Sequence, residues 1–325
     1  MNVTQHKLGT GFGAHSTADD VLEGIDLSGK TALVTGGYSG LGAETTRALV
    51  RAGASVVVPA RQPAEAREAL AGVPRVEVDT IDLADLASVR AFAERRVATG
   101  RPLDIVINNA GVMEYPHQHV ASGWEAHFAI NHLGHFALVN HLRPALGERP
   151  SRVVAVSSAG HFLSGIRWDD PHFAAGPYDS RAAYGQSKTA NALFAVHLDR
   201  LGAQAGVRAY AVHPGSILTP LQRHIPHEEQ VARGWITPEG RPAGFKTPAQ
   251  GAATAVWAAT SPLLDAYGGA YGQDCDLAEP APHDDMLVGG VKPWALDPEA
   301  AARLWALSAE LTGVDAFTRT GEDGA

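Results

Sequence analysis

Tyr184 and Lys188 are the two side chains whose types and spacing best suit proton transfer. They lie four residues apart in a stretch with helical periodicity, so they share one helix face. A tyrosine with its ordinary pKa of about 10 is a poor base near neutral pH. An ammonium group about 4 Å away contributes about 4 kcal/mol at an effective dielectric constant near 20, which would lower the phenol pKa by about three units. The pair predicts a general acid/base at Tyr184, although the same spacing also occurs on ordinary helices.

A second stretch with chemical potential is the glycine-rich sequence VTGGYSGLG, which follows a short apolar run and precedes a helical segment. Glycine at Gly36, Gly40 and Gly42 lets the backbone take positive φ and approach a ligand closely. The free N–H groups and the dipole of the following helix favour a pyrophosphate there. The commoner spacing G-x-G-x-x-G does not fit, because Tyr38 and Ala43 occupy two of its glycine positions. An ordinary glycine turn is therefore the alternative interpretation.

Runs rich in Val and Ile alternate with helical stretches over most of the chain. The runs predict strands at residues 31–35, 55–60, 75–81, 103–108, 152–158, 207–212 and 268–274. The intervening periodicity predicts a short helix within 16–25 and longer helices at 41–53, 63–70, 84–98, 124–146, 182–204, 248–260 and 298–311. Such alternation is typical of parallel strands with helices on both faces. We therefore predict an α/β fold, a single-domain, doubly wound parallel sheet of Rossmann type with about seven strands.

The expected organisation has three parts. Residues 1–28 form an N-terminal arm, 29–290 form the Rossmann domain, and 291–325 form a C-terminal helix and tail. Residues 216–247 interrupt the main domain with many Pro, Gly and His residues and little periodicity. A segment of that length without regular structure usually acts as a lid or binding loop, and here we expect it to cover the substrate.

Composition and charge narrow the classes of function. Hydrophobic residues make up 45% and charged residues 19% of the 325 residues, and the formal net charge is -9. The acidic balance argues against nucleic acid or an anionic membrane as the partner. Cys275 is the only cysteine, which suits a reducing compartment, and the sequence contains neither a secretory signal nor an apolar run long enough to span a bilayer. We expect a cytoplasmic protein that binds neither nucleic acid nor membrane.

The fifteen histidines raise the question of a metal site. His132 and His135 lie three residues apart on one expected helix, and His224 and His227 lie in the lid. No H-E-x-x-H motif or Cys/His cluster accompanies them. We interpret them as scattered polar residues and predict no metal. His213, at the end of an expected strand, is predicted to be structural.

Six motifs, in order along residues 30–274, resemble those of the short-chain dehydrogenase/reductase family. They are TGGYSGLG in the glycine turn, NNAG at 108–111, NHLG at 131–134, VSS at 156–158, YGQSK at 184–188 and HPGSILT at 213–219. Tyr184 follows Ser158 by 26 residues, which exceeds the interval in the family's simpler members. The inserted segment and the sequence STADDVLEGIDLSGK resemble the branch of retinol dehydrogenases and carbonyl reductases. The membrane anchor of that branch's lipid-metabolising members is missing here, which argues against retinoid or membrane-lipid substrates.

The family resemblance implies a role for each residue of the expected site. Tyr184 would exchange a proton with the substrate oxygen, and Ser158 would hold that oxygen by a hydrogen bond. Lys188 would lower the pKa of Tyr184 and bind the nicotinamide ribose. Asn131 would fix a water molecule that connects Lys188 to solvent. Ser157 is the alternative to Ser158, but the family pattern favours the second serine. The hydride would come from the cofactor.

The cofactor preference depends on the end of the second expected strand, VVVPAR. An acidic residue there would bind both hydroxyls of the adenosine ribose and select NAD. The chain instead has Pro59, Ala60 and Arg61, and arginine suits a 2′-phosphate. We predict NADP(H), with NAD(H) as the second choice and a solvated surface arginine as the alternative interpretation. The expected cofactor contacts are Gly36, Tyr38, Ser39, Gly40, Leu41, Gly42, Arg61, Asp82, Leu83, Asn109, Ala110, Gly111, Tyr184, Lys188, Pro214, Gly215, Ile217 and Thr219.

Substrate contacts are expected from residues 160–178 and from the lid. The candidates are aromatic or aliphatic: Phe162, Trp168, Phe173, Tyr178, Leu221, Ile225 and Trp235. They favour a mainly apolar ketone, aldehyde or alcohol without a fixed anionic group. The resemblance implies a carbonyl reductase or alcohol dehydrogenase that forms a homodimer or homotetramer through its two long helices.

Two other classes of function are the alternatives. One is a redox-inactive dinucleotide-binding scaffold or regulatory binding protein, which would not need the full set of Tyr, Lys, Ser and Asn. The other is a sugar-nucleotide epimerase or dehydratase. Its usual T-G-x-x-G-x-x-G pattern is broken here by Ser39 and Ala43.

Overall fold

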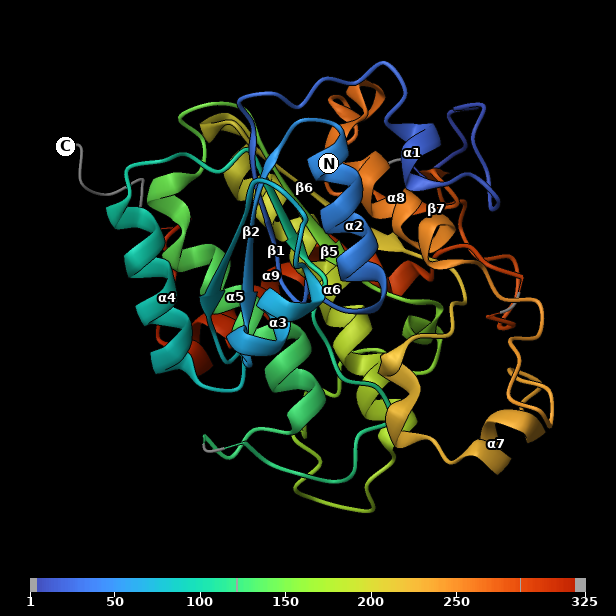
Figure 1. The fold of residues 1–325 in the computed structure, drawn as a ribbon. Coiled ribbons are helices and arrows are strands. Elements are labelled where there is room, and N and C mark those ends of the chain that lie inside the picture. The colour runs from blue at the N-terminus through green and yellow to red at the C-terminus, as the bar shows by residue number, and fades with distance from the viewer. Residues whose placement is uncertain (1–4, 121, 287, 319–325) are drawn as a thin grey trace.

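The computed structural model describes residues 5–120, 122–286 and 288–318, in which eight strands form one sheet (Figure 1). In chain order they are β1 (Thr31–Val34), β2 (Ser55–Ala60), β3 (Val76–Thr80), β4 (Ile105–Asn108), β5 (Ser151–Val156), β6 (Val207–His213), β7 (Tyr271–Gln273) and β8 (Asp276–Leu277). The sheet order is β3-β2-β1-β4-β5-β6-β7-β8, and all neighbours are parallel except β7 and β8. The predicted α/β sheet is confirmed, and β8 is a short antiparallel addition.

Helices cover both faces of this sheet (Figure 1). In the described residues the α-helices are α1 (Ala18–Val21), α2 (Gly40–Arg51), α3 (Pro63–Ala69), α4 (Leu86–Ala98), α5 (Gly134–His141), α6 (Ser180–Gly202), α7 (His227–Ala232), α8 (Pro248–Thr260) and α9 (Pro298–Thr312). One face carries α4, α5, α6 and α9, and the other carries α1, α2 and α8. None of these helices combines the length and apolar character that a membrane crossing requires.

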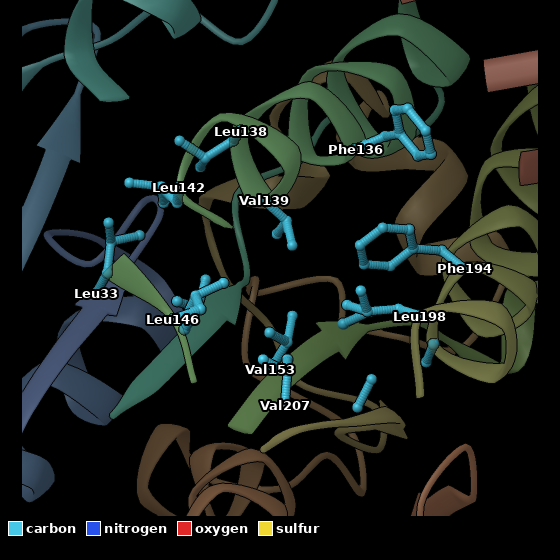
Figure 2. Close-up of a cluster of buried hydrophobic side chains, with 14 of the residues drawn as sticks. Leu33, Phe136, Leu138, Val139, Leu142, Leu146, Val153, Phe194, Leu198 and Val207 are labelled. Carbon is cyan, nitrogen blue, oxygen red and sulfur yellow. The ribbon is translucent and has the colours of Figure 1, made fainter. Parts of the chain in front are cut away.

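The strands divide their side chains between two apolar cores. Successive side chains of a strand point to opposite faces, so Leu33 joins the core under α4–α6 while its neighbour Val34 joins the core under α2 and α8. Figure 2 shows the first core, where Phe136 of α5 and Phe194 of α6 lie above Val153 of β5. Burial on both sides explains why the strands read as continuous apolar runs.

Side-chain caps fix where the helices next to the cleft begin. The carboxylate of Asp179 accepts from the backbone N–H groups of Arg181 and Ala182, so α6 starts at Ser180, four residues before Tyr184. Thr247 and Gln250 form a reciprocal capping box at the start of α8. Such caps satisfy N–H groups that have no partner inside the helix. They therefore fix the residue at which each of these helices begins.

The last helix, α9, lies across α5 and α6. The Trp305 ring stacks on Phe194 with centroids 5.9 Å apart and meets Phe136 edge-on at 4.7 Å. Ser308 Oγ and His132 Nε2 are 2.7 Å apart, so a buried polar contact accompanies the aromatic one. These contacts cover part of the two helices through which the family resemblance implied a dimer or tetramer.

Two segments differ from the sequence expectation. The helix expected at 124–146 begins as a π-helix, Phe128–Leu133, continues as α5 and ends in a 3-10 turn at Arg143–Ala145. Nearly every side chain in that stretch is buried, so the sequence has no alternation of polar and apolar faces there. Without that alternation the sequence cannot distinguish a π-helix from an α-helix. The lid contains a 3-10 turn, Pro220–His224, in addition to α7, and both are too short for periodicity to reveal.

Candidate active site

A cavity of about 670 Å³ lies at the carboxyl ends of the central strands and gathers almost the whole predicted site. Its walls include every predicted cofactor contact, together with Ser158. Of the four predicted catalytic residues, only Asn131 is absent from the cavity wall, and it lies buried one layer behind. In doubly wound sheets the crevice beside the topological switch point is the usual ligand site, and here the strand order reverses between β1 and β4.

Tyr184 and Ser158 face each other across the substrate end of this cavity. Tyr184 comes from α6, and Ser158 follows β5 and caps the short 3-10 turn after it. The Ser158 hydroxyl lies close enough to Tyr184 to favour the ionised form of its phenol. Gly160 permits this approach, because a Cβ there would lie 2.6 Å from Cε1 of the Tyr184 ring. The Ser157 hydroxyl instead donates to the carbonyl oxygen of Lys188, at 2.8 Å, so its bond ties β5 to α6.

Lys188 lies one helical turn beyond Tyr184 and is almost fully buried. Its ammonium group donates to the carbonyl oxygen of Val156 at 3.0 Å. Nζ lies 5.6 Å from the centroid of the Tyr184 ring. The carbonyl of Val156 also accepts from Asn191 Nδ2 at 3.1 Å, so α6 is held to β5 by two bonds at this point.

Burial dominates the electrostatics of the Tyr184 and Lys188 pair. It raises the pKa of Tyr184 to about 12, while the hydrogen bond with Ser158 acts in the opposite direction and the Glu114 carboxylate adds to the rise. Burial also lowers the pKa of the Lys188 amine to about 8. Desolvation, which the spacing argument left out, therefore dominates the pKa of Tyr184 in this structure, and the predicted lowering by Lys188 stays a prediction. At neutral pH the phenol keeps its proton.

Asn131 acts through its neighbours. It lies in the π-helix, where its side chain accepts from the N–H of Val112 at 2.8 Å and donates to the carbonyl oxygen of Val112 and to Ser187 Oγ. These bonds join the loop after β4 to α6. A Cβ on Gly111 would lie 2.9 Å from Asn131 Oδ1 and 3.8 Å from Lys188 Nζ, so three predicted site residues meet here. A π-turn at a functional site is a common arrangement.

The glycine turn has the shape and the donors that a diphosphate requires. Gly36 and Gly40 have positive φ, and a Cβ on Gly42 would lie 2.2 Å from the carbonyl oxygen of Gly36. Ser39 precedes α2 without a side-chain cap, and the first turn of the helix carries no acidic residue. The first N–H groups of α2 therefore point at the cavity without competition from a carboxylate. This wall fits the diphosphate of a dinucleotide.

Arg61 and Asp82, two of the predicted cofactor contacts, line one part of the cavity wall. Arg61 follows β2 and is exposed, with its side chain on the cavity wall. Asp82 accepts from the N–H of Ala84 at 2.9 Å, which fixes its carboxylate in the loop after β3. Leu83 lies beside it on the same wall. The cavity wall therefore offers a guanidinium at Arg61, a carboxylate at Asp82 and an apolar side chain at Leu83.

Several buried histidines hold the site together, a role that sequence reasoning missed. His135 connects Thr35 Oγ1, 2.8 Å from its Nε2, with the carbonyl oxygen of Asn131, 3.0 Å from its Nδ1. His161 Nδ1 lies 2.6 Å from the carbonyl oxygen of Ser158. Burial lowers the pKa of both to about 4, so both are neutral at pH 7. Their position directly after the NHLG motif and three residues after the VSS motif was the available signal.

His213 accepts from the N–H of Ala159 at 3.1 Å and supports the loop after Ser158. Its structural interpretation agrees with this contact. In the described ranges no three His, Cys, Asp or Glu side chains gather closely enough to hold a metal ion.

The part of the cavity around Tyr184 contains an apolar cluster. Met113, Tyr184 and Ile225 form a buried cluster, with Leu221 and Trp235 of the lid packed against it. Residues 160–178 contribute less than expected, because only Gly160 and Leu163 of that segment reach the cavity wall.

Four predicted substrate contacts lie elsewhere, which corrects the sequence expectation. Phe162 lies beside Lys292, and Trp168 packs under Arg303 of α9. Phe173 is buried in the inserted segment. The Tyr178 hydroxyl donates to Glu125 at 3.0 Å. Aromatic character alone did not distinguish core positions from contact positions.

Glu114 and Arg233 were also missed. They line the main cavity and a second, smaller cavity of about 290 Å³ beside it. Arg233 Nη1 and Nη2 lie 2.6 Å and 2.7 Å from the two carboxylate oxygens of Glu114. No sequence motif connects residues 119 positions apart.

Comparisons with known proteins agree with this geometry. The sequence is 47% identical over 296 residues to a probable oxidoreductase of Streptomyces lividans, covering 88% of this chain and 98% of that protein. It is 37% identical over 299 residues to mouse retinol dehydrogenase 12, covering 89% and 88%. A crystal structure of an uncharacterized protein from Mycobacterium paratuberculosis superposes with a TM-score of 0.72 at 33% identity, covering 93% and 98%.

These similarities bear on the family and on the branch within it. The sequence profile described as short chain dehydrogenase matches residues 30–230, which include the glycine turn, Ser158, Tyr184 and Lys188. The likeness to retinol dehydrogenase 12 confirms the expected resemblance to that branch. The chain therefore belongs to the short chain dehydrogenase family and is an oxidoreductase of that family.

Proposed function

We propose that the protein is an NADP(H)-dependent oxidoreductase that interconverts mainly apolar ketones or aldehydes with the corresponding alcohols. The observation that supports this most strongly is the convergence of Tyr184, Ser158 and Lys188 on one cavity whose other end is a glycine cradle. A bound nicotinamide dinucleotide would supply or accept the hydride. The protein's own residues bind the cofactor, orient the substrate oxygen and move the proton.

The proton belongs on Tyr184 at the start of a reduction. Because its pKa is about 12, the phenol is protonated at neutral pH and can donate to a carbonyl oxygen as negative charge develops there. Ser158 donates a second hydrogen bond to the same oxygen. Lys188, whose pKa of about 8 lies near neutrality, is the nearest group on α6 able to return a proton to the phenolate. Asn131 keeps the loop that carries Gly111 against this pair.

The choice of NADP(H) follows from Arg61. The side chain is exposed on the cavity wall, and β2 ends in Pro59 and Ala60 without a carboxylate that would compete for the ribose hydroxyls. A guanidinium can bind a 2′-phosphate by two parallel hydrogen bonds. NAD(H) lacks that phosphate and would gain nothing from Arg61.

We expect Arg61→Ala to raise the KM for NADPH about 10- to 100-fold and to leave the KM for NADH within about twofold, because a charge-assisted hydrogen bond contributes about 1.5–3 kcal/mol. Steady-state kinetics with both cofactors test this. Arg47→Ala is a matched control, since Arg47 is an arginine of α2 outside the cavity wall. Equal changes for both cofactors would contradict the assignment.

The proposed activity is tested with a panel of neutral aromatic and aliphatic aldehydes, ketones and alcohols, followed by NADPH absorbance at neutral and alkaline pH. We expect apolar carbonyl compounds to be reduced fastest, because Met113, Leu221 and Trp235 line the substrate end of the cavity. Tight NADPH binding without turnover of any compound would instead favour the redox-inactive scaffold.

A further inference from the structure

Glu114 has an unusual backbone for a residue with a side chain. It follows the NNAG motif and Met113 at the substrate edge of the cavity, and its φ is +45°. L-residues rarely adopt this left-handed conformation, and such strain persists where the surrounding structure enforces it, often at functional sites. Here the conformation directs the carboxylate toward the lid.

The carboxylate of Glu114 contacts Arg233, the residue that follows Ala232 and caps the C-terminus of α7. The contact is bidentate, with distances of 2.6 Å and 2.7 Å, and the two side chains are 13% and 20% exposed. Glu229 of α7 also accepts from Arg233. A shielded fork of this kind is stronger and more specific in direction than a solvent-exposed ion pair.

The ion pair stands between two cavities. Glu114 and Arg233 line both the main cavity and the smaller one, whose other walls include Asp179, His224 and Glu229. On the main-cavity side, their near neighbours Met113 and Trp235 pack in the cluster around Tyr184. The Arg233 guanidinium also lies over the Trp235 ring, 4.8 Å from its centroid. Separation of Glu114 and Arg233 would release the lid residues that line the main cavity. It would also connect the main cavity with the smaller one.

We propose that Glu114 and Arg233 form a clasp that closes the lid over the substrate side of the site and restricts that site to substrates without a carboxylate. The proposal rests on the function proposed above. Two N–H groups of the Arg233 guanidinium already donate to Glu114. A substrate carboxylate could bind Arg233 only by displacing the Glu114 carboxylate. The two negative charges would then lie close together and repel each other. Arg181 and Arg223 also line the cavity, but both are exposed, and solvent screens their attraction for an anion.

The first test measures lid closure without any need for activity. Glu114→Gln keeps the size of the side chain and removes its charge. We expect limited trypsin digestion to cleave the variant after Arg223 and Arg233 about tenfold faster than the wild type, because cleavage follows the population of the open lid. Glu94→Gln is the matched control, since it breaks the exposed Arg90–Glu94 pair on α4 and should leave these sites unchanged. Cleavage of Glu114→Gln at the wild-type rate would overturn the clasp.

The second test measures specificity with a neutral aromatic aldehyde and the same aldehyde bearing a carboxylate. We expect Glu114→Gln to raise the ratio of kcat/KM for the charged over the neutral compound about tenfold, which is about 1.4 kcal/mol. The double variant Glu114→Gln/Arg233→Gln should lose that gain, because the freed cation is gone. A ratio that stays constant across all variants would overturn the specificity role. If no variant or wild type turns over any carbonyl compound, the proposed function fails, while the digestion result still decides the clasp.

Discussion

Tyr184→Phe is expected to lower kcat/KM for carbonyl reduction by at least about a thousandfold while NADPH binding changes by less than about twofold. The phenol is protonated at neutral pH and lies beside Ser158 on the cavity wall, and general acid catalysis contributes about 10²- to 10⁴-fold. The ring itself remains, so its packing against Gly160 and Met113 is kept. Steady-state kinetics and cofactor titration by fluorescence measure the two effects separately.

Tyr267→Phe is the control for this experiment. Its ring packs with the second core, next to α8, and is absent from the cavity wall. The control should keep wild-type turnover. Turnover in Tyr184→Phe above a tenth of the wild-type rate would contradict the role of the phenol and with it the proposed function.

Lys188→Met is expected to lose at least about a hundredfold in turnover and, at the same time, to be more stable than the wild type at pH 7. Burial lowers the pKa of the amine from its ordinary value of 10.5 to about 8. The charged amine therefore lowers the free energy of unfolding of the wild type by about 3 kcal/mol. Methionine has a similar length and no charge. The carbonyl of Val156 keeps its bond from Asn191, so the substitution leaves it with a partner.

The stability gain should depend on pH in a defined direction. Below pH 8 the amine carries its proton in both the folded and the unfolded chain, and the folded wild type contains a buried charge. Above pH 10.5 the amine is neutral in both states and the penalty disappears. The difference in unfolding free energy between Lys188→Met and wild type should therefore shrink by about 3 kcal/mol between pH 8 and 10.5.

Denaturant unfolding at several pH values measures this difference. Tyr184 and the other titratable groups are present in both proteins, so their titration cancels when the two unfolding free energies are subtracted. Lys30→Met is the matched control. Its ammonium lies 3.0 Å from the Asp104 carboxylate, so its removal should bring no gain. A Lys188→Met variant that is less stable than the wild type at pH 7 would show that hydrogen bonding by Lys188 outweighs its desolvation.

The chemistry-bearing residues were predictable because each belongs to a local pattern. Gly36, Gly40 and Gly42 are close in sequence, and Tyr184 and Lys188 share one turn of α6, so short spacings were enough to name them. The alternation of strands and helices then placed these patterns at one edge of the sheet. The structure brings them to a single cavity by that route.

The remaining features depend on distant contacts and on burial, which spacing does not encode. Glu114 and Arg233 meet across 119 positions, and the sign of the Tyr184 pKa change follows from desolvation in the finished fold. The π-turn that holds Asn131 lies in a stretch with almost no polar face, so periodicity could not distinguish it from an α-helix. Aromatic residues of the inserted segment were assigned to the substrate, although most of them anchor that segment to the core.

The position of α9 has a consequence for self-association. Trp305 and Ser308 occupy the outer surface of α5 and α6 within the same polypeptide, much as a neighbouring subunit would. Two copies could pair through that surface only if each first peeled away its own final helix and exposed the aromatic rings beneath. At this position the protein's own final helix occupies the space that a partner's side chains would need, so pairing of two copies there would compete with the packing of α9.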